Sequence, residues 1–164
     1  MIKHSIAIVA VIAMMTTSVW AARQEHTFEV FLTVPSRSFY LMPTEPGWIH
    51  QPQELIWDHP GAKLGSLRKS FEVRHDTSAI EARVDGAPHL SNGKPGEVIE
   101  LWVRFNEVTL APNAPPREVV SAEDAAAGKR AWLEITPLKP SGGYRPGDYS
   151  GNVLVLFNAK APGA

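Results

Sequence analysis

Apolar and polar residues alternate along several short segments of this 164-residue chain, which is the pattern of β-strands with one solvent-facing side. The alternation is clear in residues 66–74 and 80–85. Residues 98–110 form the longest such segment, and its one-sided apolar positions are Ile99, Leu101, Val103 and Phe105. Shorter strands are expected at residues 38–41, 54–57 and 132–135. The pattern therefore predicts a protein built from strands.

Prolines and glycines separate these segments. All 14 prolines follow residue 22, and most lie between the apolar runs. One short helix is expected at residues 121–128, because Ser121 can cap its start and Gly128 can end it. Residues 151–158 are apolar on both faces, so we expect this last strand to lie inside the structure.

This arrangement predicts an all-β fold. About seven strands, a single helical turn and no alternation of strands with long helices favour an antiparallel β-sandwich of immunoglobulin-like type. A partly open barrel is the second candidate.

The first 22 residues have the features of a secretory signal. Lys3 gives a basic start, and an apolar run from Ile6 to Met15 follows. The run is too short to span a bilayer. Cleavage is expected after Ala21 or Ala22. We therefore expect one exported domain, and because the chain has no cysteine, packing and strand pairing must stabilise it without disulfides.

A further apolar strand pattern follows the predicted signal directly, in residues 26–34. Its one-sided positions are Phe28, Val30, Leu32 and Val34. A strand this apolar needs a groove to enter. The pattern alone leaves open whether that groove belongs to the same domain or to a neighbouring molecule.

Composition and motifs argue against catalysis and against nucleic acid as a partner. The net charge is −1 and no basic block is present. No cysteine nucleophile and no Gly-x-Ser-x-Gly motif occur. The adjacent pairs Asp58-His59 and His75-Asp76 would point to opposite faces of a strand, so neither makes a natural dyad. The six histidines lack zinc-ligand spacing. We predict no catalytic residues, no cofactor and no metal.

The tryptophans support an alternative function. Trp102 and Trp132 lie in strands and are expected in the core or on a sheet face. Trp48 follows Pro-Gly in a loop and is the better candidate for an exposed contact, whereas the place of Trp57 is open. An exported β-sandwich that binds carbohydrate would expose Trp48 and Trp57 on one face, and the apolar N-terminal strand would then belong to its own sheet.

Three parts of the chain together resemble a known family. They are the alternating strand ending at Val34-Pro35, the Ala-rich turn at residues 123–128, and the closing motif Gly147-Asp148-Tyr149-Ser150-Gly151-Asn152-Val153-Leu154-Val155-Leu156-Phe157. In this order, and without cysteine, they are similar to the coli-surface-antigen type (alpha-type) fimbrial major subunits, which the alternate chaperone–usher pathway assembles.

The resemblance implies an incomplete immunoglobulin-like β-sandwich that is completed by donor-strand exchange. Residues 23–35 would be the donor strand and residues 36–164 a single pilin domain. The groove-filling side chains would be Phe28, Val30, Leu32 and Val34, and the groove-edge strand would contribute Val153, Val155 and Phe157.

The resemblance also implies partners and a location. The chain would be the shaft subunit of an adhesive surface filament, polymerising with identical subunits. It would meet a periplasmic chaperone, an outer-membrane usher, a tip adhesin and a receptor on a host surface.

Overall fold

The computed structural model of the protein describes residues 39–161. The chain divides into two units, residues 1–34 and 35–164, and all described residues belong to the second. The predicted signal peptide and the strand predicted at residues 26–34 lie outside the described residues. Among the described residues, no helix is long and apolar enough to cross a membrane.

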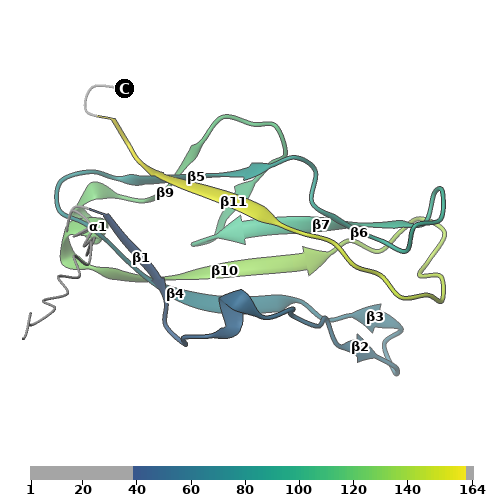
Figure 1. Ribbon diagram of the computed structural model, residues 1–164. Coiled ribbons are helices and arrows are strands. Elements are labelled where there is room, and N and C mark those ends of the chain that lie inside the picture. The colour runs from purple at the N-terminus through teal and green to yellow at the C-terminus, as the bar shows by residue number, and fades with distance from the viewer. Residues whose placement is uncertain (1–38, 162–164) are drawn as a thin grey trace, which may run out of the picture. The chain divides into compact units, whose positions relative to one another are not determined.

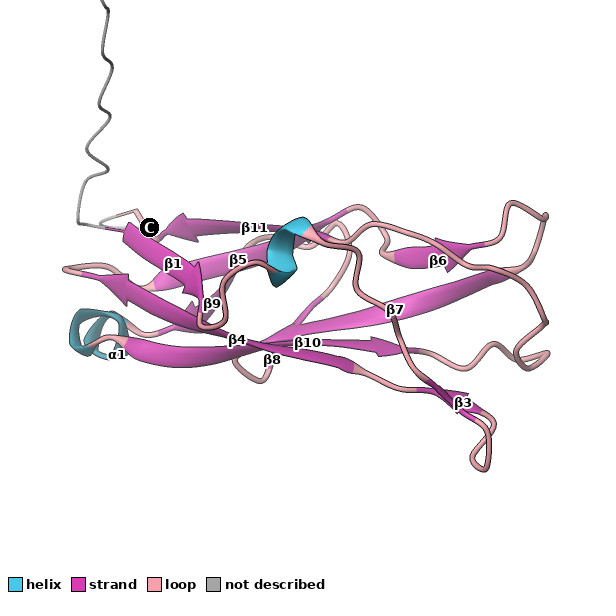
Figure 2. Ribbon diagram, turned by 60° about the horizontal axis from the view of Figure 1, so that its bottom comes forward, coloured by secondary structure: helices cyan, strands magenta, loops and turns pink. Residues whose placement is uncertain are grey.

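The described chain forms two antiparallel sheets that face each other, as Figures 1 and 2 show. The larger sheet has the order β1 (Phe39–Pro43), β4 (Leu67–His75), β10 (Lys129–Pro137), β7 (Val98–Phe105) and β6 (His89–Ser91), with β8 (Val108–Leu110) also paired to β7. The smaller sheet has the order β11 (Leu154–Ala159), β5 (Ile80–Asp85) and β9 (Arg117–Val120). The short elements are the hairpin β2 (Trp57–Asp58) and β3 (Lys63–Leu64), the 3-10 turn η1 (Trp48–His50) and helix α1 (Ala122–Ala127).

The core lies between the two sheets and follows the alternation in the sequence. The apolar face predicted for residues 98–105 is buried in β7, while Trp102 on the opposite face is 44% exposed. In β5 the alternate residues Ile80, Ala82 and Val84 are fully buried. The strands predicted at 66–74 and 80–85 are therefore confirmed as β4 and β5, with the expected sides inward.

Two predicted strands differ from the structure. The segment 98–110 is a hairpin of β7 and β8, because Asn106 and Glu107 adopt positive φ angles of 46° and 68° and reverse the chain. Such a two-residue turn matches the right-handed twist of its flanking strands. The strand predicted at 54–57 was placed too early, since only Trp57 of that segment lies in β2.

The predicted helix is confirmed as α1. The Ser121 hydroxyl accepts a hydrogen bond from the backbone N–H of Asp124 at 3.2 Å, which caps the first turn. Gly128 ends the helix with φ of 81°, a conformation that glycine adopts at little cost. Ala125 is fully buried, so this turn is fixed onto the end of the sandwich beside β4.

The two long sides of the sandwich differ. On one side β8 lies next to β9, and the Asn106 side-chain amide donates a 2.6 Å hydrogen bond to the Val119 carbonyl. On the other side β1 and β11 end their sheets, and no hydrogen-bonded register joins them within residues 39–161. The prediction that the last strand lies inside the structure is therefore wrong for the described chain. β11 is an edge strand, and its Leu154 is 53% exposed.

Candidate functional site

The outer edge of β11 pairs with no strand of residues 39–161, and its apolar side chains are only half covered. Val153, Val155 and Phe157 point toward the core and are half-buried. Their neighbours one strand inward are Val84, opposite Val155, and Ala82, opposite Phe157, and both are fully buried. The inner side of β11 is thus well covered, and the exposure lies at its outer edge, where no strand of residues 39–161 pairs with it.

The edge strand β1 shows the same feature on the facing sheet. Phe39 and Leu41 are half-buried and pack against the core. Their register partners in β4 are His75 and Val73, both buried. We call the open side between β1 and β11 the edge groove. Its half-buried apolar side chains are Phe39 and Leu41 on one sheet and Val153, Val155 and Phe157 on the other.

A row of aromatic rings crosses the core beside the edge groove. The ring centroids of Phe157 and Phe105 are 4.8 Å apart, those of Phe105 and Phe71 are 5.8 Å apart, and those of Phe71 and Trp48 are 5.6 Å apart. Tilted and edge-on contacts of this kind stabilise aromatic pairs beyond the apolar area that they bury. The row links β11 to η1 through the two inner strands β7 and β4.

Trp48 is not the exposed loop residue that the sequence predicts. We expected it as an exposed contact in a loop, but its ring packs edge-on against Phe71 and its indole nitrogen is buried. The Lys69 ammonium lies 5.3 Å from the centre of the same ring. Because the ring of Trp48 is held against the core, Trp48 and Trp57 do not form the exposed pair that a carbohydrate-binding face would require.

His75 is the last residue of β4 and lies opposite Phe39 of β1. Its Nδ1 atom accepts hydrogen bonds from the backbone N–H groups of Ser78 at 2.8 Å and Thr77 at 3.2 Å. Its ring lies 6.2 Å from that of Phe39. The adjacent Asp76 is exposed and pairs with Arg74 at 3.7 Å, so His75 and Asp76 do face opposite ways and form no dyad.

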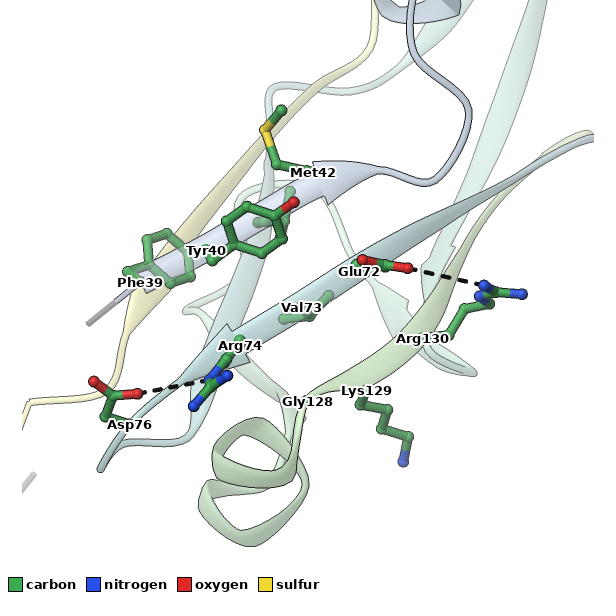
Figure 3. A pocket seen from close by; sticks show the side chains of 11 residues that line it. Phe39, Tyr40, Met42, Glu72, Val73, Arg74, Asp76, Gly128, Lys129 and Arg130 are labelled. Carbon is green, nitrogen blue, oxygen red and sulfur yellow. Dashed lines mark ion pairs between the residues drawn. The ribbon is translucent and has the colours of Figure 1, made fainter. Parts of the chain in front are cut away.

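A hollow beside β1, β4 and β10 is lined by both apolar and charged side chains. Figure 3 shows Tyr40 and Met42 of β1 beside Glu72 and Arg74 of β4, with Arg130 of β10 beyond them. The charges are matched locally, since Arg130 pairs with Glu72 at 3.9 Å and Arg74 with Asp76. These ion pairs are exposed, so each contributes little to stability.

Trp102 and Trp132 lie on the outer face of the larger sheet, as expected for sheet-face residues. Trp132 is 38% exposed, and the Arg68 guanidinium lies 4.2 Å from its ring centre. Glu134 contacts Arg68 at 3.1 Å and Arg104 at 3.5 Å, and Arg104 in turn lies near Trp102. Within residues 39–161 no three histidine or acidic side chains gather as a metal site would need.

The structure brings together the groove-edge residues predicted from the sequence, and it adds others. Val153, Val155 and Phe157 lie along one edge, whereas Phe28, Val30, Leu32 and Val34 lie outside the described residues. Sequence reasoning missed Phe39 and Leu41, which line the facing edge. Their alternation with Tyr40 and Met42 is the signal that could have found them.

The comparisons with known proteins agree with this architecture. The CooA pilin subunit from enterotoxigenic Escherichia coli matches with a TM-score of 0.54 at 17% identity, over 64% of this chain and 76% of that chain. At this identity the match establishes the fold, an immunoglobulin-like pilin sandwich. No curated protein sequence matches the chain.

A family comparison goes further. The family of CS1 type fimbrial major subunits matches residues 24–158, which is most of the chain. The chain therefore belongs to this family and is a fimbrial major subunit. It is a structural protein that assembles with copies of itself into a filament on the cell surface.

Proposed function

We propose that this subunit polymerises by donor-strand exchange through the edge groove. Phe28, Val30, Leu32 and Val34 of one subunit enter the groove between β1 and β11 of the next. The observation that carries the proposal is the pair of half-buried apolar rows on two unpaired sheet edges. An incoming strand supplies backbone hydrogen bonds to β11, and its alternate side chains complete the core.

The dimensions of strand and groove support this pairing. Residues 28–34 and residues 153–159 are equally long, and both place apolar side chains at every second position, with the series on β11 ending at Ala159. Each buried side chain of this size contributes about 1.5–3 kcal/mol before the cost of ordering the strand. Each backbone hydrogen bond adds about 0.5–1.5 kcal/mol.

The contact is head-to-tail, because the strand and the groove are different parts of one chain. Heterologous contacts of this kind form open filaments unless the rotation between subunits closes a ring. The absence of cysteine then carries no penalty, since the neighbour's strand supplies the stability that a disulfide would otherwise give.

Export and assembly follow from the same assignment. Residues 1–22 are a signal peptide cleaved after Ala21 or Ala22, residues 23–35 are the donor strand and residues 36–164 are the pilin domain. The subunit crosses the periplasm bound to a chaperone that occupies the edge groove. An outer-membrane usher adds it to a filament that carries a tip adhesin and meets a host-surface receptor. The chain itself catalyses no reaction.

The alternation of the donor strand gives a sharp test. Leu32→Asp places a charge in the groove, whereas Thr33→Asp places the same charge on the outward face of the same strand. We expect Leu32→Asp to abolish filaments on cells expressing the full chain, and Thr33→Asp to leave them near wild-type number in electron micrographs. Equal filament numbers in the two variants would refute donor-strand exchange by this face.

A further inference from the structure

An apolar patch lies at the end of the sandwich opposite α1. The hairpin of β2 and β3 projects there, and Figure 1 shows it far from α1. Ile56, which directly precedes β2, is 77% exposed, and Trp57 is 37% exposed. We call Ile56, Trp57 and Tyr144 the hairpin patch.

The hairpin patch is held in a fixed conformation. The Gly65 N–H donates a 2.8 Å hydrogen bond to the Ile56 carbonyl, and Trp57 pairs with Leu64 across the hairpin. The rings of Trp57 and Tyr144 meet edge-on with centroids 5.3 Å apart, which joins the hairpin to the loop after β10. An exposed apolar surface that is already rigid loses little entropy on binding a partner.

The strand registers show which ends of the sandwich the edge groove connects. Ala159 lies opposite Ile80, beside the turn that follows His75, so this end of β11 is the α1 end. Leu154 lies opposite Asp85, so Val153 is at the hairpin end. A donor strand antiparallel to β11 therefore enters with Phe28 at the α1 end and leaves with Val34 at the hairpin end.

The segment that follows Val34 is too short for the body of the donating subunit to lie far from the acceptor. Only residues 35–38 separate Val34 from β1, so Val34 and Phe39 are at most about 17 Å apart even in a fully extended chain. Phe39 pairs with His75 in β4, directly beside the exposed turn of Asp76 and Thr77. The α1 end of the donating subunit must then face the hairpin end of the acceptor.

We infer that the hairpin patch is a second contact between subunits, and that its partner is the α1 end of the next copy of this chain. The partner face is the turn after β4 (Asp76–Ser78) with the neighbouring helix α1. This inference rests on the proposed donor-strand exchange, because the direction of the donor strand and the length of residues 35–38 decide which ends meet. The contact sets how adjacent subunits are oriented within the filament.

Cross-linking tests this contact separately from the donor strand. The chain has no cysteine, so introduced thiols are unique. The end pair is His59→Cys with Thr77→Cys, one at the hairpin tip and one at the turn after β4, and both wild-type residues are exposed. The donor pair is Glu29→Cys with Asn158→Cys, on the outward faces of the donor strand and of β11. Filaments sheared from cells are treated with a bismaleimide and run on denaturing gels, with the four single-cysteine chains as controls.

Covalent ladders from both pairs, absent in the single-cysteine controls, are the expected result. A ladder from the donor pair alone would overturn the hairpin-patch contact and leave donor-strand exchange standing. A ladder from the end pair alone would overturn donor-strand exchange and keep an end-to-end contact. No ladder from either pair would overturn both proposals.

A matched pair of substitutions tests the apolar character of the patch. Ile56→Asp places a charge in the hairpin patch, and Ile49→Asp places it on η1, which lies apart from the hairpin in Figures 1 and 2. Ile49 is also exposed, at 50%. We expect filaments of Ile56→Asp to fall apart in detergent roughly tenfold faster than wild type, and Ile49→Asp filaments to behave as wild type. Equal rates for the two variants would overturn the inference.

Discussion

The ring of Phe157 packs edge-on against Phe105, with the centroids 4.8 Å apart and the planes at 67°. Phe105 is fully buried at the end of the inner strand β7, whereas Phe157 lies on β11, which ends the smaller sheet among residues 39–161. This contact fixes the position of the groove edge relative to the core. It also means that one side of Phe157 is already covered before any neighbour binds.

Phe157 should therefore contribute more to the free energy of unfolding than the other apolar residues of β11. We predict that Phe157→Ala lowers the free energy of unfolding by about 2–3 kcal/mol, because it removes a core contact and leaves a cavity. Leu154→Ala, on the outward face of the same strand, should cost less than about 1 kcal/mol. Urea unfolding of a chain that begins at Pro35 and carries residues 23–34 after Ala164 through a flexible linker measures both. Equal losses would contradict the assignment of the two faces.

His75 is predicted to stabilise the turn after β4 through its acceptor nitrogen. His75→Phe keeps an aromatic ring but leaves the N–H groups of Thr77 and Ser78 without this acceptor, at a cost of about 1–3 kcal/mol. In His75→Asn the side-chain oxygen can still accept a hydrogen bond, so this variant should lose less stability. The comparison of the two melting temperatures checks this, and a more stable His75→Phe would refute it.

The hairpin between β7 and β8 contains a strained residue that can be improved. Glu107 has φ of 68°, a left-handed conformation that costs a non-glycine residue about 1 kcal/mol. Glu107→Gly creates the Asn-Gly sequence that such a turn favours, and it keeps the Asn106 bond to Val119. We expect an increase of about 0.5–1 kcal/mol in the free energy of unfolding. A decrease in denaturant melts would show that the turn has another geometry.

Asp124 makes the stability of the fold depend slightly on pH in the acid range. The hydrogen bond from the Lys129 ammonium, at 2.7 Å, holds the pKa of Asp124 below its ordinary value. Partial desolvation opposes this effect, and the charge of Lys129 and the Ser121 hydroxyl add smaller contributions that lower the pKa further. Because the folded-state pKa is lowered, this stabilisation is complete above the unfolded pKa of about 4 and is lost as the pH falls through the folded value.

The melting temperature of Asp124→Asn should therefore fall less than that of wild type when the pH is lowered from neutral to about 3. Lys129→Met removes the partner of Asp124, so it should also reduce the drop in melting temperature between neutral pH and about pH 3. If Asp124→Asn and wild type show the same loss of melting temperature over this range, the pKa of Asp124 is not lowered by folding.

Most of the core could be predicted from the sequence because the alternation is regular where one face is buried. Ile99, Leu101, Val103 and Phe105 were assigned to the correct side, since a period of two fixes the face once the strand is located. The break at Asn106 and Glu107 is hidden inside one long apolar segment, although asparagine is a turn residue and the apolar positions shift there from Phe105 to Val108 and Leu110.

The place of the last strand and of Trp48 required the tertiary structure. Residues 151–158 are apolar on both faces, and this pattern alone does not distinguish an interior strand from a strand that ends its sheet. Trp48 follows a Pro-Gly turn, yet the chain returns there onto β4 and its ring meets Phe71. Burial by a segment distant in sequence leaves no periodic signal.

The most direct measurement compares the size and thermal unfolding of two chains. One is the mature chain in native order, and the other begins at Pro35 and carries residues 23–34 behind Ala164 through a flexible linker, so that they can run antiparallel to β11. We predict that only the rearranged chain is a soluble monomer that melts cooperatively, while the native-order chain aggregates or forms multimers. If the native-order chain is already a stable monomer with an equal melting temperature, its N-terminal strand completes its own sheet and donor-strand exchange is refuted.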